Sequence, residues 1–461
     1  MLRASLTALL ESWNPPRVGD ATARRALWFS FADGVCSVAV IALLDTHGMA
    51  ALLSLRASDF MVAMLPTLAL FLASLVQLAT PYVSAHLNAR KPLSCACVVG
   101  QVICLVLLGL AGWTRPAAAP LVFVLIYALY SMSGNFGSAV WISWIGDLVP
   151  EQVRGRMFAW RSRCFSIAQV SVGVLSGIIV KQFLGPDKSW VVFMSVFMVA
   201  AFFRLVAFFC LVRQYEPPLT FKPASHDFTY LDFILKARTS NFSRFTIFIA
   251  LIHGGTAIAG PFFAKYYLTV LKIPYDTFAL IVNAYLIGML IFLPFWGRIS
   301  DRYGNWLVVK ITAVAIALFP LPYLFFTSPV VLWFLGFFAG VAWSGFSLAN
   351  FSYQLDTVTP PRRVRCAAYM SVTVGFAVFA CGLLGGWLVD HLPPLFWWNS
   401  NYQTLFALSS IVRMTVIVFF LGFGLVHEIR SVKPVTIKGL ITELPGIRLV
   451  LDIFRGAAKI S

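Results

Sequence analysis

The chain has 461 residues, 60% of them hydrophobic and 11% charged, and its formal net charge is +17. Soluble domains are typically about half apolar and about a quarter charged, so this composition excludes an ordinary soluble protein. The apolar residues form long continuous runs rather than short alternating ones. This pattern predicts helices that cross a lipid bilayer and argues against a membrane β-barrel.

The apolar runs predict twelve membrane-spanning helices, and therefore an all-α membrane protein. In chain order the predicted spans are 26–45, 60–80, 92–113, 118–145, 163–184, 189–212, 244–270, 275–297, 305–326, 329–350, 366–389 and 401–426. The longest polar stretch between spans separates six of them from the other six. The predicted organisation is a cytoplasmic N-terminal segment (1–25), a six-helix bundle (26–212), a cytoplasmic central loop (213–243), a second six-helix bundle (244–426) and a cytoplasmic tail (427–461). Spaced basic residues among apolar ones in 436–461 favour an interfacial helix there.

The distribution of Lys and Arg predicts the orientation in the membrane. With both termini in the cytoplasm, 27 of the 35 basic residues fall in cytoplasmic segments and six on the opposite side. Such a bias is typical of multi-pass membrane proteins, because basic loops are retained on the cytoplasmic side. We therefore predict that the protein lies in the cell (inner) membrane. The basic excess is therefore explained by topology and by attraction to anionic lipid headgroups, without a nucleic-acid partner.

The second half of the chain repeats the first at a shift of 209 residues. Over residues 141–177 against 350–386, 11 of 37 positions are identical. The matches include charged residues and glycines in register, which apolar composition alone does not produce. Two such halves predict an internal duplication, with a binding site at the interface between the repeats.

Three cytoplasmic loops resemble those of the major facilitator superfamily of secondary transporters. The stretch "GRISDRYGNW" (297–306) is similar to the family's signature between spans 8 and 9, and "DLVPEQVRGR" (147–156) and "DTVTPPRRVR" (356–365) are similar to its loops 4–5 and 10–11. The corresponding loop of the first half, 81–91, lacks the Gly and the Asp. The resemblance covers about residues 25–428 and is closest to bacterial members whose substrates are unassigned. It implies two pseudo-symmetric six-helix bundles around a central cavity lined by spans 1, 4, 7 and 10.

The same resemblance implies a cytoplasmic gate that stabilises the outward-open state. Gly297 and Gly304 are expected to allow close helix approach and unusual backbone angles. Asp301 is expected to accept hydrogen bonds from a helix N-terminus or from a loop Arg. The alternative is a simple turn with a solvated ion pair. The predicted gate residues are Gly297, Asp301, Arg302, Gly304, Asp147, Arg154, Arg156, Asp356, Arg363 and Arg365.

Ionisable residues inside spans are costly in hydrocarbon, which makes them candidates for function. Asp33 lies in span 1 and His253 in span 7, so both are candidates for substrate contact or proton coupling. The alternatives are a carboxylate partner for Arg24 or Arg25 and a packing histidine. Four amides are further candidates for substrate contact, or else links between helices. These amides are Asn135, Gln169, Asn283 and Asn350.

Arg204 and Arg413 occupy equivalent positions in spans 6 and 12. The resemblance places these spans outside the cavity wall. A structural role is therefore predicted, in which each Arg snorkels or pairs with an Asp such as Asp147 or Asp356. Binding of an anion is the alternative.

We therefore predict a secondary active transporter that moves a small molecule by alternating access, with proton coupling as an open question. The alternatives are a lipid or lysolipid flippase of the same fold and a non-transporting scaffold or assembly factor. The sequence shows no phosphate-binding loop, nucleophile elbow or metal-spaced His set, so no enzyme, cofactor or metal is predicted. Membrane lipids and a small solute are the expected partners, and the protein is expected to be a monomer.

Overall fold

The computed structural model describes residues 21–87, 90–114, 117–148, 151–185, 189–216, 229–235, 240–359, 362–395, 398 and 400–430. Within this part of the chain, twelve helices are long and apolar enough to cross a membrane. This number confirms the all-α, twelve-span prediction.

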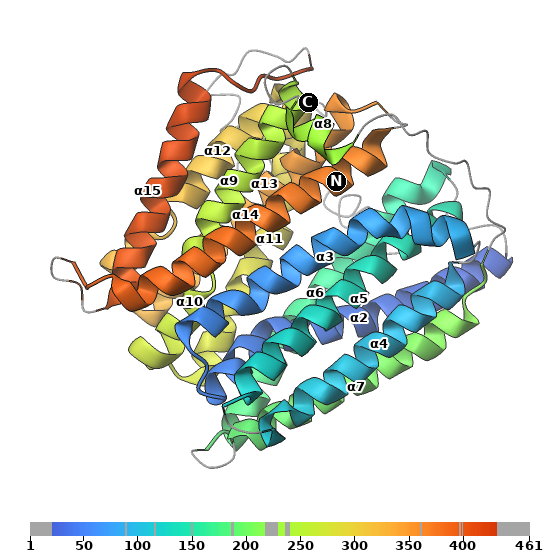
Figure 1. Ribbon diagram of the computed structural model, residues 1–461. Coiled ribbons are helices and arrows are strands. Elements are labelled where there is room, and N and C mark those ends of the chain that lie inside the picture. Colours follow the sequence, from blue (N-terminus) through green and yellow to red (C-terminus); the bar gives the residue numbers. More distant parts are fainter. Residues whose placement is uncertain are drawn as a thin grey trace, which may run out of the picture.

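The first six spans form one bundle, the N half, and the last six form another, the C half (Figure 1). The N half consists of α2 (Ala21–Ser54), α3 (Asp59–Leu87), α4 (Lys91–Leu110), α5 (Ala119–Leu148), α6 (Glu151–Phe183) and α7 (Ser189–Arg213), with a short 3-10 turn at Ala111–Trp113. The C half begins with α9 (Asn241–Ala259), α10 (Phe262–Lys265) and a π-helical segment (Tyr266–Val270), which together make one span. It continues with α11 (Tyr275–Tyr303), α12 (Asn305–Leu318), a 3-10 turn (Leu321–Leu324), α13 (Pro329–Thr357), α14 (Arg363–His391) and α15 (Asn401–Gly422). A short helix, α8 (Tyr230–Leu235), lies between the halves in sequence.

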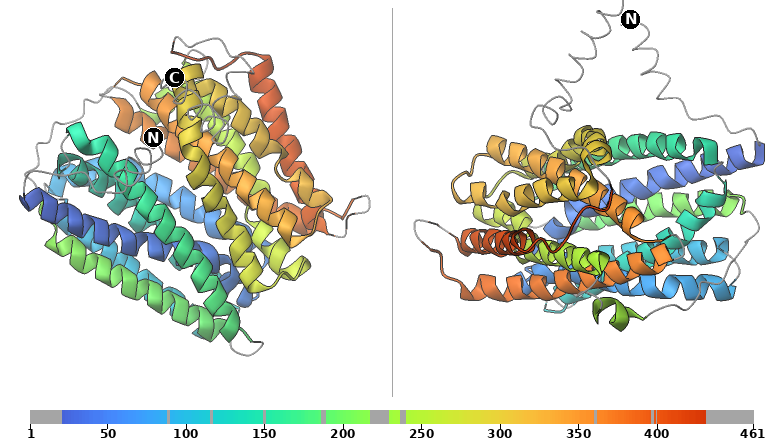
Figure 2. Two further views of the ribbon diagram at one scale, coloured as in Figure 1. Left: turned by 180° about the vertical axis from the view of Figure 1, so that it is seen from behind. Right: turned by 90° about the horizontal axis from the view of Figure 1, so that it is seen from above.

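The two halves converge at the end that holds α10 and separate toward the end that holds α8 (Figures 1 and 2). We call the first the outer end and the second the inner end, following the orientation predicted from the basic residues. Helix α8 packs on the C half, where the hydroxyls of Tyr230 and Thr373 are hydrogen bonded at 3.1 Å.

Two helix pairs join the halves, and glycines of the sequence repeat lie in both. The first seam is formed by α6 and α11, and the second seam by α3 and α14. A Cβ atom added at Gly173 would overlap the side chain of Asn283 in α11, and one at the equivalent Gly382 would overlap Thr67 in α3. The repeat therefore places glycine where the helices of opposite halves approach most closely.

Two predicted helix boundaries are wrong. Span 1 was expected to end at residue 45, but α2 continues to Ser54 and places Asp45 well inside the helix. Span 8 was expected to end at residue 297, but α11 continues through Tyr303 and only Gly304, with a φ of +91°, separates it from α12. The close helix approach expected at Gly297 is absent, because a Cβ there would meet only Leu348, at an ordinary 3.8 Å.

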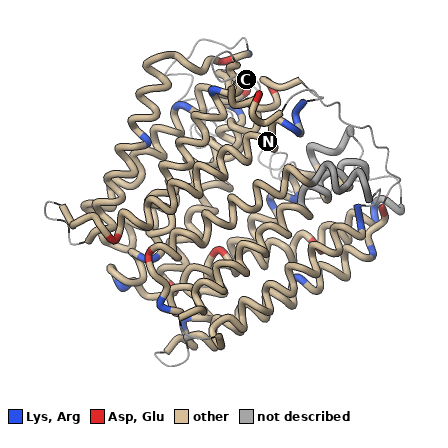
Figure 3. Tube along the Cα trace, viewed as in Figure 1, with Lys and Arg blue, Asp and Glu red and all other residues tan. Residues whose placement is uncertain are grey.

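Most charged residues lie near the helix ends, and few lie within the bundles (Figure 3). Charged side chains avoid hydrocarbon unless other protein groups compensate them, so the few interior ones need an explanation. The interfacial helix expected in 436–461 lies outside the described residues.

Candidate functional site

The outer end of the first seam is closed by hydrogen bonds around His47. This side chain is fully buried in α2, and its two ring nitrogens contact Tyr275 Oη of α11 at 2.6 Å and Ser176 Oγ of α6 at 2.9 Å. Next to it, Asn283 of α11 donates to Thr46 Oγ1 at 3.5 Å. Because the bonds of His47 to Tyr275 and of Thr46 to Asn283 join α2 to the C half, they close the space between the halves on the outer side.

Two ion pairs complete the outer closure. Lys181 of α6 lies 2.7 Å from Asp276 of α11, and Lys265 of α10 lies 2.9 Å from Asp59 at the start of α3. Asp59 also accepts a hydrogen bond from Tyr402 Oη at 2.9 Å.

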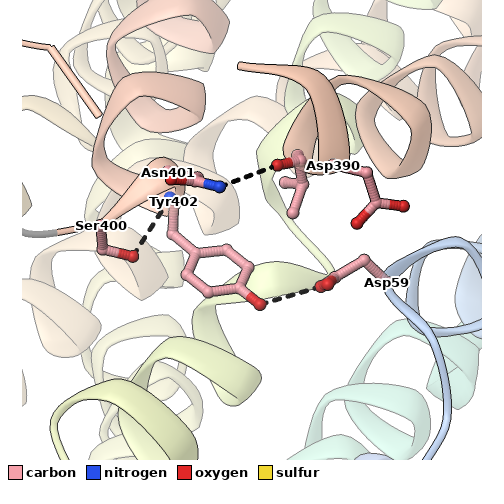
Figure 4. A pocket seen from close by; sticks show the side chains of 6 residues that line it. Asp59, Asp390, Ser400, Asn401 and Tyr402 are labelled. Atoms are coloured by element: carbon pink, nitrogen blue, oxygen red, sulfur yellow. Dashed lines mark hydrogen bonds between the residues drawn. The ribbon is translucent and has the colours of Figure 1, made fainter. Parts of the chain in front are cut away.

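A cavity of about 360 Å³ opens beside the Asp59 contact (Figure 4). It is lined by Asp59, Val389, Asp390, Ser400, Asn401 and Tyr402. Its lining includes the residues that hold the outer end closed.

The ion pairs at the inner end stay within one half wherever both partners belong to the described residues. In the N half, Glu216 accepts from the backbone of Arg90 and pairs with its side chain. In the C half, Asp356 accepts from Asn305 at 2.7 Å and pairs with Arg430 at 2.6 Å. In the described part of the chain, the ion pairs that join the two halves therefore lie at the outer end.

Asp45 is an interior carboxylate on the inner side of the hydrogen bonds around His47. Its side chain is exposed, although it lies inside a membrane span and two residues before His47. Gln169 of α6 donates to it at 3.5 Å, and its charge acts on Tyr127 and Tyr130 of α5 and on Tyr285 of α11. Residues from both halves therefore lie within reach of the charge of this exposed carboxylate. We call the space around Asp45, Gln169 and these three tyrosines the chamber.

Asp33, in contrast, belongs to a buried network within the N half. Ser37 donates to its carboxylate at 3.5 Å, and the charges of Arg204 and Arg161 act on it. Arg161 is held by Ser30 and lies over the ring of Trp141, 4.3 Å from its centroid. The alternative partners considered for Asp33, Arg24 and Arg25, are exposed on the surface.

His253 of α9 is half-buried against aromatic rings of α13. Its ring centroid lies 5.1 Å from that of Trp343 and 5.7 Å from that of Phe346. It makes no hydrogen bond to another described residue, so its ring nitrogens are available to a ligand or to water.

The four candidate amides occupy different places. Gln169 contacts Asp45 in the chamber, whereas Asn283 is buried in the first seam. Asn135 accepts from Gln77 of α3 at 3.3 Å and so links two helices of the N half. Asn350 accepts from Gln354 one turn further along α13. Among these four amides, Gln169 contacts an interior charged residue, Asp45.

The predicted gate residues do not form one cluster among the described side chains. Asp301 is exposed and has no partner among the described residues, and Arg302 lies over the ring of Tyr303. Arg363 caps the end of α13 by donating to the carbonyls of Val358 and Leu355. Arg365 is half-buried in the first turn of α14. The side chains of Asp147, Arg154 and Arg156 lie outside the described part of the structure.

Neither intramembrane arginine uses the Asp partner considered for it. Arg204 donates to Gln101 Oε1 of α4 at 2.7 Å and to Ser37 of α2. Arg413 is buried and donates to the carbonyls of Ile316 and Ser409 and to the Ser409 hydroxyl. Asp356 is occupied by its own partners at the inner end. Both arginines therefore tie helices of one half together.

Sequence reasoning missed Asp45 because the hydropathy pattern placed the end of span 1 at that residue. A carboxylate at a helix end is common and suggests no function. Asp45 instead lies about nine residues before the end of α2, inside the membrane span, where a carboxylate is a candidate for function. The polar sequence "DTH" (45–47) within a helix that continues through "MAALLS" (49–54) was the available signal. No cluster of His, Cys, Asp and Glu suited to a metal ion occurs among the described residues.

Comparisons with known proteins agree with this architecture. The family model described as "Major Facilitator Superfamily" matches residues 26–252 and 245–455. A search of curated protein sequences finds no match. Among solved structures, the nucleoside transporter NupG superposes with a TM-score of 0.65 at 16% identity, covering 88% of this chain and 99% of that one. A D-xylose-proton symporter superposes with a TM-score of 0.68 at 14% identity, covering 88% and 99%.

A bacterial homologue of the iron transporter ferroportin matches in two states. Its inward-facing structure gives a TM-score of 0.65 at 14% identity, covering 88% of this chain and 99% of that one, and its outward-facing structure gives 0.56. At these identities the structural matches establish the fold alone. The family model covers most of the sequence, and the twelve helices form the two bundles expected of that family. The chain belongs to the major facilitator superfamily.

Proposed function

We propose that this protein is a secondary active transporter that carries a small organic solute through the chamber by alternating access, with proton coupling through Asp45. It acts in the cell (inner) membrane as a monomer, with both termini in the cytoplasm, and it is not an enzyme. The observation that carries the proposal is an exposed interior carboxylate, with residues of both halves around it, directly below the bonds that close the outer end.

The closed outer end and the separated inner end correspond to an inward-facing state. The match to the ferroportin homologue supports this assignment, since its inward-facing structure superposes better than its outward-facing one. The exposed Asp301, without a partner among the described residues, fits the same state, because a cytoplasmic gate is released when the cytoplasmic side opens. Alternating access requires the outer bonds to break and the inner gate to form, so Gly297, Asp301, Arg302, Gly304 and the charged residues of loops 4–5 and 10–11 stay in our proposal as that gate.

The chemistry of the chamber supports transport over a purely structural role. A scaffold gains stability by filling its centre with apolar side chains, because unpaired polar groups in a bilayer are costly. Here Asp45 and Gln169 bring polar atoms to the chamber, and the hydroxyls of Tyr127 and Tyr285 have no hydrogen-bond partner among the described residues. Such groups suit a solute that supplies the missing partners.

Proton coupling is assigned to Asp45 rather than Asp33. Asp33 is linked through Ser37 to Arg204 in the same half, so changing its protonation would disturb a fixed network. Asp45 makes no ion pair with a described residue, and its charge reaches Tyr285 in the opposite half. It can therefore hold a proton in one state of the cycle and release it in the other.

The test uses purified protein in liposomes under an imposed pH gradient, with labelled solutes of differing charge, including a nucleoside and a pentose because of the superposed transporters. We expect at least one solute to accumulate only with the gradient, and Asp45→Asn to abolish this while leaving gradient-independent exchange intact. Asp33→Asn and His253→Ala test the two candidates from the sequence in parallel.

Spin-label distances give a second measure that does not depend on the solute. Exposed positions Arg56 and Lys272 report the outer end, and Arg213 and Ile429 report the inner end. In a cysteine-free background, the two distances should change in opposite directions between states. A single fixed distance at both ends, together with no gradient-driven uptake of any solute, would show that the protein is not a transporter.

A further inference from the structure

The charge balance of the chamber indicates what kind of solute it accepts. Asp45 receives one long hydrogen bond from Gln169 and makes no ion pair with a described Lys or Arg. An ionised carboxylate in a low-dielectric site is costly unless a cation or several donors compensate it. The described residues around Asp45 supply neither.

The basic residues of nearby spans are bound elsewhere. Arg161 donates to the hydroxyl and the carbonyl of Ser30, at 3.0 and 3.2 Å. Arg204 donates to Gln101 and Ser37, and Arg413 to Ile316 and Ser409. The charges of Arg161 and Arg204 also act on Asp33 within the N half. Among the described side chains of the chamber, the net charge is therefore negative.

Tyrosine rings lie near Asp45. Tyr127 of α5 packs over α2 at Gly48, where a Cβ atom would lie 3.7 Å from its ring. The charge of Asp45 also reaches Tyr285 of α11. Aromatic faces attract cations and also stack on aromatic or apolar bodies.

We propose that the chamber binds an organic monocation, with its positively charged group at Asp45 and its apolar or aromatic body against the tyrosines. This proposal rests on the transport function proposed above and names the class of solute carried. A cation supplies the charge that Asp45 lacks, whereas an anion is repelled by the carboxylate. A neutral sugar does not supply this charge, so Asp45 would have to be compensated by a proton instead.

Two probes of nearly equal shape and opposite charge test the assignment. Tetraphenylphosphonium is the cation and tetraphenylborate is the anion, and binding of each to purified full-length protein in detergent is measured by equilibrium dialysis. We expect the cation to bind the wild type, and Asp45→Asn to weaken it by about tenfold or more, the effect of losing one charged partner. The anion should bind wild type more weakly than the cation does.

Matched variants control for non-specific effects. Asp390→Asn removes the same charge from the outer cavity and should leave binding of the cation unchanged. Asp45→Glu keeps the charge and should keep most of the binding. Size-exclusion chromatography and thermal unfolding confirm that each variant is folded.

The assignment is overturned if wild type does not bind the cation, if Asp45→Asn binds it as tightly as wild type, or if the anion binds as tightly as the cation. Binding in detergent requires no transport, so the two proposals fail separately. Cation binding without any gradient-driven uptake would contradict the transport function alone. Uptake of a neutral solute without cation binding would contradict the solute class alone.

Discussion

The two seams that join the halves are built on equivalent glycines but differ in chemistry. The first seam is polar: His47 bridges Tyr275 and Ser176, and Asn283 packs against Gly173. The second seam is apolar over much of its length. There Phe71 of α3 stacks on Phe379 of α14 with ring centroids 5.0 Å apart.

The seams also differ in how far they reach toward the inner end. Close contacts in the second seam continue along α14 from Gly386 to Gly375, about 16 Å at helical rise. The polar contacts of the first seam lie between Asp276 and Asn283 of α11, about 10 Å. An apolar contact lined with glycine can slide without leaving polar groups unpaired, whereas separating a polar seam exposes partners that must find new ones. We therefore expect both seams to hold the outer end closed, the second through close packing that can shift gradually and the first through polar bonds that must break.

The largest expected effect comes from filling the second seam. Gly382→Leu inserts a side chain where a Cβ already overlaps Thr67, so α3 and α14 must move apart. Overpacking of this kind costs about 1–3 kcal/mol, which corresponds to a shift of about 5- to 150-fold in the equilibrium between outer-closed and outer-open states. Spin labels at Arg56 and Lys272 should show a longer outer distance.

The control for this variant is Gly185→Ala, because no atom of a described residue lies within 4 Å of a Cβ at Gly185. It should leave the outer distance as in wild type. If Gly382→Leu also leaves that distance unchanged, the second seam does not hold the outer end closed.

The sequence repeat marks residues of both seams, although it predicted neither their packing role nor their chemistry. Glycines at 173, 177, 382 and 386 stand out in the repeat because they recur in register among residues that otherwise diverge. Their structural role follows from the need for close helix packing. The side chains between them carry no such periodic signal, so the His47 bridge could not be foreseen from spacing alone.

The twelve spans and their two-bundle arrangement could be predicted because hydrocarbon imposes a simple length and polarity rule. The candidate site could not, because it depends on where a helix ends. Asp33 was singled out as the interior carboxylate of span 1, but the structure buries it in a network of the N half, in which Ser37 links it to Arg204. Asp45 was placed at a helix end, and only the extension of α2 to Ser54 shows that it lies inside the protein.

A smaller effect is expected from the ion pair beside the second seam. Asp59→Asn keeps an acceptor for Tyr402 but removes the charge that faces Lys265, in a pair whose side chains are only 15% and 16% exposed. Such a pair contributes between a surface salt bridge and a buried one, so we expect a shift of about tenfold toward the outer-open state. The same outer labels measure it.

Asp390→Asn is the matched control for Asp59→Asn. Asp390 lines the same cavity but makes no ion pair or hydrogen bond with a described side chain (Figure 4). An equal shift in both variants would mean that the total charge of the cavity, rather than the Lys265 contact, holds the outer end closed.

The smallest effect is expected at the ion pair of the first seam. Lys181 is 49% exposed and Asp276 is 28% exposed, so water and salt screen their attraction. Lys181→Gln should shift the outer equilibrium by less than about fivefold, the range of a surface salt bridge, and about 1 M salt should remove most of the difference from wild type. If Lys181→Gln instead matches Asp59→Asn and resists salt, the ion pair is the main lock of the first seam. Opening would then begin with the loss of that charge pair rather than with the His47 hydrogen bonds.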